Sequence, residues 1–316
     1  MLSYTIRRLL LILPTLLLVT IIVFTVIRLV PGDVIELMAS EQEFISGKGA
    51  EAIRHALGLD APIFVQYWRW ISGIVQGDFG TSLWTGEPVI EEITRRYPIS
   101  FELGLLALVM GLLIALPIGV YSAIRQDSAG DYISRSFAIL CITVPSFWLG
   151  TLVMVLPAIW WHWSPSMVYI PFISDPLGNL KMFIIPSAIL GMGLSGTTMR
   201  MTRTMMLEVL RQDYIRTAWS KGLSERTIVI RHALKNALIP VVTIVGMQLP
   251  ILIGGSVILE NIFNLPGIGR LFLQVINNRD YTVLSGINLI MAFFVLVLNV
   301  VVDLTYAFLD PRIQYK

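Results

Sequence analysis

Six long apolar runs constrain this chain more than any other feature. A bilayer core about 30 Å thick needs ~20 mostly apolar residues per helix, and each run is long enough. The chain is 55% hydrophobic and only 14% charged, against about 25% charged in soluble domains, which excludes an ordinary soluble enzyme and a disordered chain. We therefore predict an all-α integral membrane protein with membrane-spanning helices at residues 9–30, 100–124, 135–160, 182–205, 237–262 and 283–308.

The charges between these runs predict the orientation. The segment from Arg200 to Lys235 holds eight Lys or Arg residues against three acids, so it is expected to be cytoplasmic. The loop from Pro31 to Pro98 holds five basic and ten acidic residues, and residues 161–180 contain no Lys or Arg, so both are expected outside. With six spans, both termini are then cytoplasmic.

The long external loop is expected to be structured, because loops of this length without helices or strands are uncommon in compact proteins. Residues 49–57 have a helical composition. Further on, Phe64, Tyr67, Trp68 and Ile71 recur with helical spacing, and such aromatic side chains suit a membrane interface. We predict three parts: an uncleaved N-terminal transmembrane helix at 1–30, a small external helical cap at 31–98, and a five-helix core at 99–316 with a cytoplasmic loop at 206–236.

Within that cytoplasmic loop the sequence predicts a short helix with its own start and stop. Asp213 can cap the N-terminus, Gly222 can take the left-handed conformation that ends a helix, and Ser224 can cap the next one. A helix of about two turns is marginal in water, so something must pack against it. A basic loop resting on anionic lipid headgroups is the alternative. The paired caps, the aromatic residues and the basic rim favour a groove on a partner protein. The residues assigned to this docking role are Asp213, Tyr214, Arg216, Thr217, Ala218, Trp219, Lys221 and Gly222.

Polar residues inside the apolar runs are candidates for a translocation path, because a charge in hydrocarbon costs at least ~2.5 kcal/mol. Packing or capping is as plausible for the pair on the last helix, which lies at i and i+4. Arg28 is expected to extend its charge to the outer interface. A glycine-rich helix with Pro250, from Thr243 to Ser256, is expected to be kinked and to line the pore. The candidates are Glu102, Gln248, Glu260, Asn299 and Asp303.

We expect no catalytic residue, metal site or cofactor in this chain. Cys141 is the only cysteine, and the three histidines fall in three different segments. No Gly-x-x-x-x-Gly-Lys-Ser/Thr phosphate loop occurs, so ATP and Mg would have to be bound by another chain. A formal charge of +2 offers no basic surface for nucleic acid.

The cytoplasmic loop resembles the signature loop of bacterial ABC importer permeases, which reads Glu-Ala-Ala-x-x-x-Gly with a downstream Pro. The corresponding residues here are Arg216, Thr217, Ala218, Gly222 and Pro240, so the first two depart from the pattern. With the stretch 231–237, these departures are similar to the dipeptide, oligopeptide and nickel branch, although Trp219 stands where a smaller or basic residue is expected. Further matching stretches are 31–33, 57–60, 77–80, 144–148, 266–269, 279–280 and 310–313.

The resemblance implies a type I ABC importer permease fold in a bacterial inner membrane. The implied partners are a second homologous permease subunit, two cytoplasmic ABC ATPase subunits and an external solute-binding protein, in addition to the lipid bilayer itself. Transport of small peptides by alternating access is the expected function, with nickel, glutathione or an oligosaccharide as alternative cargo. An ion-coupled secondary transporter is a rival, and it would show internal repeats and broken helices, neither of which we identify in the sequence. A membrane-embedded enzyme would need clustered catalytic residues at one depth.

Overall fold

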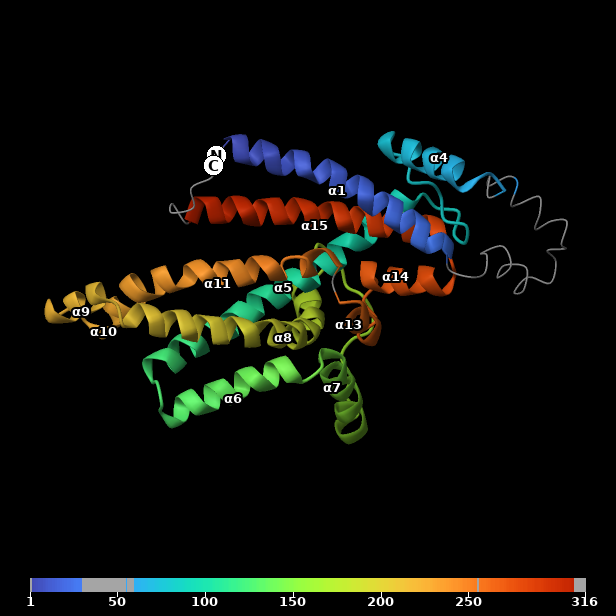
Figure 1. Cartoon of the computed structure of the whole chain (residues 1–316). Helices are drawn as coiled ribbons and strands as arrows, with labels where there is room; N and C mark the ends of the chain where they lie inside the picture. Colours follow the sequence, from blue (N-terminus) through green and yellow to red (C-terminus); the bar gives the residue numbers. More distant parts are fainter. Residues whose placement is uncertain (1, 30–54, 56–59, 255, 310–316) are drawn as a thin grey trace. The chain divides into compact units, whose positions relative to one another are not determined.

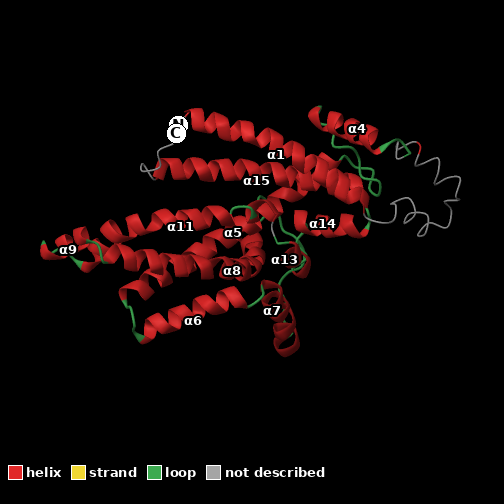
Figure 2. Ribbon diagram, in the orientation of Figure 1, coloured by secondary structure: helices red, strands yellow, loops and turns green. Residues whose placement is uncertain are grey.

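The computed structural model describes residues 2–29, 55, 60–254 and 256–309. Within these residues the fold is helical throughout, and Figure 2 shows helices joined by loops with no strand. An isolated bridge pairs Thr81 with Pro88. The chain divides into two compact units. The larger contains Ser100–Leu265 and Leu298–Lys316, and the smaller contains Leu2–Ile99 and Pro266–Val297. Of the helix expected at 49–57, only His55 is described.

The larger unit is arranged around the long helix α8 (Pro176–Leu210), which packs against α6 (Ala129–Thr143) and α11 (Lys235–Gln248), as Figure 1 shows. Helix α5 (Val89–Ile124) approaches α8 closely: a Cβ atom built on Gly191 would lie 2.6 Å from the carbonyl oxygen of Ala107. Small residues allow two helix backbones to come this near in a membrane protein. The other helices of this unit are α7 (Ser146–Trp161), α9 (Asp213–Ser220), α10 (Glu225–Thr227), the π-helix η1 (Ile228–Leu234), α12 (Ile251–Gly254) and α13 (Val257–Ile262).

The smaller unit contains α1 (Leu2–Leu29), α4 (Ile63–Val75), α14 (Ile268–Asn277), the first turns of α5 and the first half of α15 (Tyr281–Leu309). Its core includes Val89 of α5, Leu271 of α14 and Ile287 of α15. The loop after α4 is attached to the turn between α14 and α15, because the Ser82 hydroxyl donates to the Asp280 carboxylate over 2.6 Å. Helix α4 packs along α1.

The number of membrane-crossing helices agrees with the expectation. Five described helices are long and apolar enough to cross a bilayer, and the total is six if the pair α6 and α7 forms one span. The five are Leu10–Leu29, Val89–Ile124, Pro176–Leu210, Glu225–Gln248 and Tyr281–Val302. Helix α5 begins well before residue 100, inside the segment predicted as an external cap.

Two of the expected spans are broken. The break in the run at 135–160 was not predicted, whereas the run at 237–262 was expected to be kinked near Pro250. The run at 135–160 forms α6 and α7, which meet at 91°. Pro145, which lacks an N–H group, precedes α7, and Val144 is extended, as a residue before proline usually is. In the run at 237–262, α11 ends at Gln248, before Pro250. The single turn α12 (Ile251–Gly254) follows, and α13 starts at Val257, where the Ser256 hydroxyl caps it. The fifth span instead extends back to Glu225.

Candidate docking site

Helix α9 lies where α8 ends and η1 begins, at one end of the larger unit (Figure 1). It covers Asp213–Ser220, close to the two turns expected. Gln212 is the residue before the helix, so Asp213 is the first helical residue rather than the cap that was predicted. Its carboxylate accepts a hydrogen bond from Arg216 over 3.2 Å. An acidic residue in the first turn also interacts favourably with the helix dipole.

The end of α9 is fixed by the glycine that the sequence singled out. Gly222 has φ +74°, a backbone conformation that residues with a Cβ atom rarely adopt. Its N–H donates to the carbonyl of Trp219 over 2.9 Å, and the N–H of Leu223 donates to Ala218 over 3.4 Å. This pair of bonds is the Schellman arrangement, which satisfies the last carbonyl groups of a helix. The left-handed stop predicted at Gly222 is confirmed.

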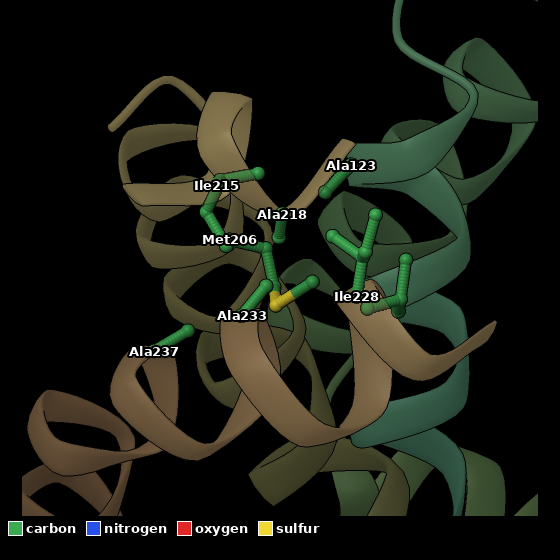
Figure 3. Close-up of a cluster of buried hydrophobic side chains, with 8 residues drawn as sticks. Ala123, Met206, Ile215, Ala218, Ile228, Ala233 and Ala237 are labelled. Atoms are coloured by element: carbon green, nitrogen blue, oxygen red, sulfur yellow. The ribbon is translucent and has the colours of Figure 1, made fainter. Parts of the chain in front are cut away.

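One face of α9 is buried against its own chain. Ile215 and Ala218 are 0% and 7% exposed, and both belong to a cluster drawn in Figure 3. We call this set the anchor cluster: Ala123, Met206, Ile215, Ala218, Ile228, Val229, Ala233 and Ala237. It joins the ends of α5 and α8 to α9, η1 and the start of α11. The short helix is therefore packed against its own chain without a partner chain, and Ala218 lies on the buried side, in the anchor cluster.

The rest of the surface of α9 is exposed, with Tyr214 and Trp219 on the two sides of the buried strip. Tyr214 and Trp219 are 44% and 48% exposed, although aromatic residues usually lose much more of their surface in a folded chain. Arg216, Thr217 and Lys221 are exposed beside them. This surface, which we call the docking face, combines two aromatic rings with two positive charges. Aromatic residues and arginine are the residue types that most often dominate binding at protein interfaces.

The docking face is tied to the next membrane helix by a polar contact that the sequence analysis missed. The Asn236 amide, in the first turn of α11, donates to the Tyr214 hydroxyl over 2.9 Å and to the His232 carbonyl over 3.0 Å. Between α9 and α11 runs η1, a seven-residue π-helix. Such wide turns are rare and are often found at functional sites. Tyr214 thus belongs both to the exposed surface and to a contact with α11.

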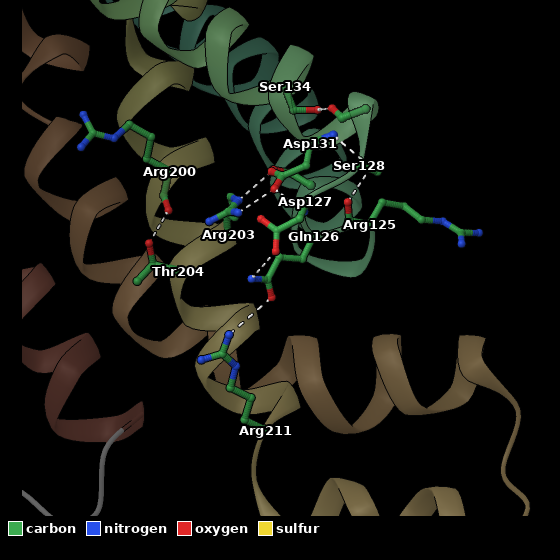
Figure 4. A network of polar contacts seen from close by, with 12 residues as sticks. Arg125, Gln126, Asp127, Ser128, Asp131, Ser134, Arg200, Arg203, Thr204 and Arg211 are labelled. Carbon is green, nitrogen blue, oxygen red and sulfur yellow. Dashed lines mark hydrogen bonds and ion pairs between the residues drawn. The ribbon is translucent and has the colours of Figure 1, made fainter.

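A buried ion pair holds the same end of the larger unit together (Figure 4). Asp131 is fully buried, and its two carboxylate oxygens accept bonds of 2.8 and 2.7 Å from Arg203. The Ser122 hydroxyl and the Asp127 N–H donate to the same carboxylate over 2.5 and 3.0 Å. These bonds join the turn between α5 and α6 to α8. No local pattern could have identified this pair, since Asp131 and Arg203 are 72 residues apart.

Of the candidates for a translocation path, two acids lie at about the same level of α5 but on different sides of it. Glu260 is fully buried and accepts a bond from the Ser100 hydroxyl over 2.7 Å. Glu102, two residues further along α5, is half-buried, and the Asn179 amide lies 3.4 Å from its carboxylate. Near this acid, burial raises the pKa of Tyr169, and the Glu102 charge adds to that shift.

The remaining candidates lie elsewhere. The Gln248 amide donates to the Leu194 carbonyl over 3.1 Å and to the Thr198 hydroxyl over 3.3 Å, so it joins α11 to α8. Asn299 is exposed on α15, and the side chain of Asp303 lies outside the described residues. Among the described residues, no group of three or more His, Cys, Asp or Glu side chains could hold a metal ion.

Comparisons with known proteins identify the family. Residues 115–315 match the family model described as binding-protein-dependent transport system inner membrane component, and residues 1–104 match its N-terminal counterpart. A putative peptide transport system permease protein of Brucella abortus (strain 2308) is 42% identical over 302 residues, 96% of each chain. The glutathione transport system permease protein GsiC of Salmonella paratyphi A is 37% identical over all 316 residues, 100% of each chain.

Among solved structures, the MetNI methionine ABC transporter in an inward-facing conformation has a similar fold. The TM-score is 0.55 over 70% of this chain and 97% of the other, with 14% sequence identity. A multi-pass membrane chain with this fold, matched by the family model over most of its length, belongs to the permease subunits of binding-protein-dependent ABC importers.

Proposed function

We propose that this chain carries small peptides across a bacterial inner membrane and that the docking face of α9 binds a groove on a cytoplasmic ATPase subunit. The observation that carries the docking proposal is that one side of α9 is buried in its own chain while the rest of the helix is exposed. Ile215 and Ala218 fix the helix to its own chain, while Tyr214 and Trp219 stay exposed. A rigid helix that presents aromatic rings and positive charges is suited to a groove on another protein.

The anchor cluster could transmit a movement of α9, caused by the ATPase, to the membrane helices α8 and α11. Because Ile215 and Ala218 are packed with residues of α8, η1 and α11, a displacement of α9 must move these elements or open the cluster. Protein interiors are densely packed and transmit strain rather than absorb it. ATP binding and hydrolysis in two partner ATPases would thus alternate the access of a pathway formed with a second, homologous permease subunit. An external binding protein would deliver the cargo.

Small peptides are the proposed cargo, and glutathione is the second candidate. The relative from Brucella is named for peptide transport and the one from Salmonella for glutathione, and glutathione is itself a tripeptide. Both carry an ammonium group and carboxylates. The carboxyl groups of Glu102 and Glu260, at one level of α5, are the residues of this chain we propose to attract the ammonium group.

Two substitutions test the docking role. Trp219→Asp replaces an aromatic ring of the docking face by a negative charge, and Gly222→Pro cannot adopt φ +74°. Aromatic hot-spot residues contribute about 2 kcal/mol or more, equivalent to roughly 30-fold in affinity. We expect both variants to reach the membrane but to lose ATP-driven uptake in proteoliposomes with the partner subunits. Trp219→Phe is the matched control and should retain uptake. Wild-type uptake by Trp219→Asp would refute the docking role.

The cargo is tested separately from the docking. The cognate external binding protein is titrated with dipeptides, glutathione, nickel and an oligosaccharide in a calorimeter. We expect tight binding of dipeptides or of glutathione, and no tight binding of nickel or the oligosaccharide. Uptake of the bound ligand by the reconstituted transporter should then fall when Glu102→Gln and Glu260→Gln are introduced. Preferential binding of nickel or the oligosaccharide would overturn the peptide assignment while leaving the docking of α9 unaffected.

A further inference from the structure

An apolar cavity lies among α1, α4 and α15 in the smaller unit. Its volume is about 330 Å³. Thr20 is the lining residue with a polar side chain, and its hydroxyl already bonds to the Leu17 carbonyl over 2.7 Å and to the Tyr67 hydroxyl over 2.8 Å. A ligand of this cavity must therefore be apolar where it lies inside. The lining residues used below are Leu16, Leu17, Ile74, Leu289 and Phe293.

The cavity lies at the depth of lipid acyl chains. Leu17 is twelve residues before Leu29, where α1 ends, which corresponds to about 18 Å along the helix. Leu289 and Phe293 lie about 12 and 18 Å from the first residue of α15, counted in the same way. Both helices are candidate membrane spans, and one hydrocarbon leaflet is about 15 Å thick. Two helices thus independently place the cavity inside the hydrocarbon.

The cavity is reachable from outside the unit. Leu17 and Phe293 line it and are 54% and 45% exposed. Helix α4 continues this apolar surface, since Phe64 and Trp68 are 74% and 72% exposed on the side that does not pack on α1. Apolar cavities exclude water and bind apolar molecules. In a bilayer, the apolar molecules at hand are acyl chains.

A positive charge stands above the cavity on the same helix. Arg28 follows Leu17 by eleven residues, a spacing that brings two side chains back to within about 20° of one another around a helix. Its Nε donates to Gln66 of α4 over 3.0 Å, and its guanidinium lies 3.5 Å over the Phe24 ring. No carboxylate of the described residues forms an ion pair with it. Guanidinium groups bind phosphate through two parallel hydrogen bonds.

We propose that this cavity and Arg28 form a phospholipid site, with one acyl chain among α1, α4 and α15 and the phosphate bound by Arg28. The separation of Arg28 from Leu17 is about 16 Å along α1, close to the thickness of one hydrocarbon leaflet. The lipid would help to hold α4 against α1. The direct contacts there are the rings of Tyr67 and Trp70, 5.2 and 5.5 Å from that of Phe24, and the hydrogen bonds from α1 to Tyr67 and Gln66. The site shares no residue with the docking face of α9.

The test uses the assembled transporter in phosphatidylethanolamine nanodiscs that contain a phosphatidylethanolamine with a photoactivatable diazirine in one acyl chain. After irradiation and digestion, mass spectrometry should locate the label on lining residues of α1, α4 and α15, above the level on the exposed residues of α6. Leu16→Trp and Ile74→Trp, which fill the cavity from two helices, should each lower that labelling several-fold. The control Leu13→Trp, 64% exposed and outside the lining, should not.

The role of Arg28 is tested with a second probe. Arg28→Gln should lower labelling by the phospholipid about tenfold, the loss expected for a charge-assisted contact, and leave labelling by a diazirine diacylglycerol unchanged. Equal labelling of α6 and of the cavity residues would mean ordinary surrounding lipid and would overturn the proposal. So would a cross-link from Leu17 or Phe293 to the second permease subunit, because that protein would then cover the cavity. Size-exclusion chromatography confirms that each variant is assembled.

Discussion

Removing the carboxylate of Asp131 should strongly destabilise the end of the larger unit that carries α9. The side chain is fully buried and accepts four hydrogen bonds, two from Arg203 and one each from Ser122 and the Asp127 backbone. In Asp131→Asn the positive charge of Arg203 remains without its counter-charge. Breaking a buried ion pair from one side costs about 3–5 kcal/mol. At roughly 2–4 °C per kcal/mol, the midpoint of thermal unfolding should fall by about 6–20 °C.

The single cysteine provides the assay. Cys141 is buried in α6, the helix that contains Asp131, and packs beside Met199 of α8. Its modification by a maleimide after heating, measured by mass spectrometry, therefore reports the separation of α6 from α8. Asp127→Asn is the matched control, because that exposed side chain lies in the same turn and asparagine tolerates its φ of 61°. The control should change stability by no more than about 0.5 kcal/mol.

A double substitution distinguishes the ion pair from simple packing. Asp131→Leu combined with Arg203→Met removes both charges, and should cost less than either single change, because no buried charge is left alone. The reasoning is refuted if Asp131→Asn and Arg203→Met each have the same midpoint of thermal unfolding as the wild type. It is also refuted if the double variant loses as much stability as the two single variants added together.

Three further outcomes follow from the geometry. Gly191→Ala should destabilise by about 1–3 kcal/mol because the new Cβ would lie 2.6 Å from a carbonyl oxygen of α5, whereas Gly193→Ala, with open space around it, should be neutral or stabilising; thermal melting compares them. Tyr214→Phe and Asn236→Leu both remove the hydrogen bond between these side chains, about 0.5–1.5 kcal/mol, and Asn236→Leu also removes the bond to the His232 carbonyl. Both should lower transport per ATP hydrolysed without preventing assembly, and additive effects in the double variant would contradict the contact. Ile215→Asp buries a charge in the anchor cluster and should release α9, which limited proteolysis would detect; unchanged protection would exclude the packing described.

Local features of the sequence account for much of the fold. The lengths of the apolar runs determine how many helices can cross a bilayer, since the thickness to be spanned is fixed. The sequence predicts the short helix α9 because its stop is local: a glycine, here Gly222, adopts φ +74° without strain. The breaks at Pro145 and Pro250 also have a local cause, since each lies at a single proline. The kink near Pro250 is predicted from the sequence, but the break at Pro145 is not, because mean hydropathy over a whole span does not register a single residue that cannot continue a helix.

Only the tertiary structure decided which face of α9 is exposed and what lies behind it. Helical spacing alone cannot tell whether Ile215 or Tyr214 turns inward, because both are large and mainly apolar; the anchor cluster decides this by bringing α5, α8 and η1 together. In the same way, Asp131 meets Arg203 across 72 residues, and α4 reaches α1 through Tyr67. Sequence determines what each segment can form by itself. The partners across long separations depend on the packing of whole helices, which no local pattern encodes.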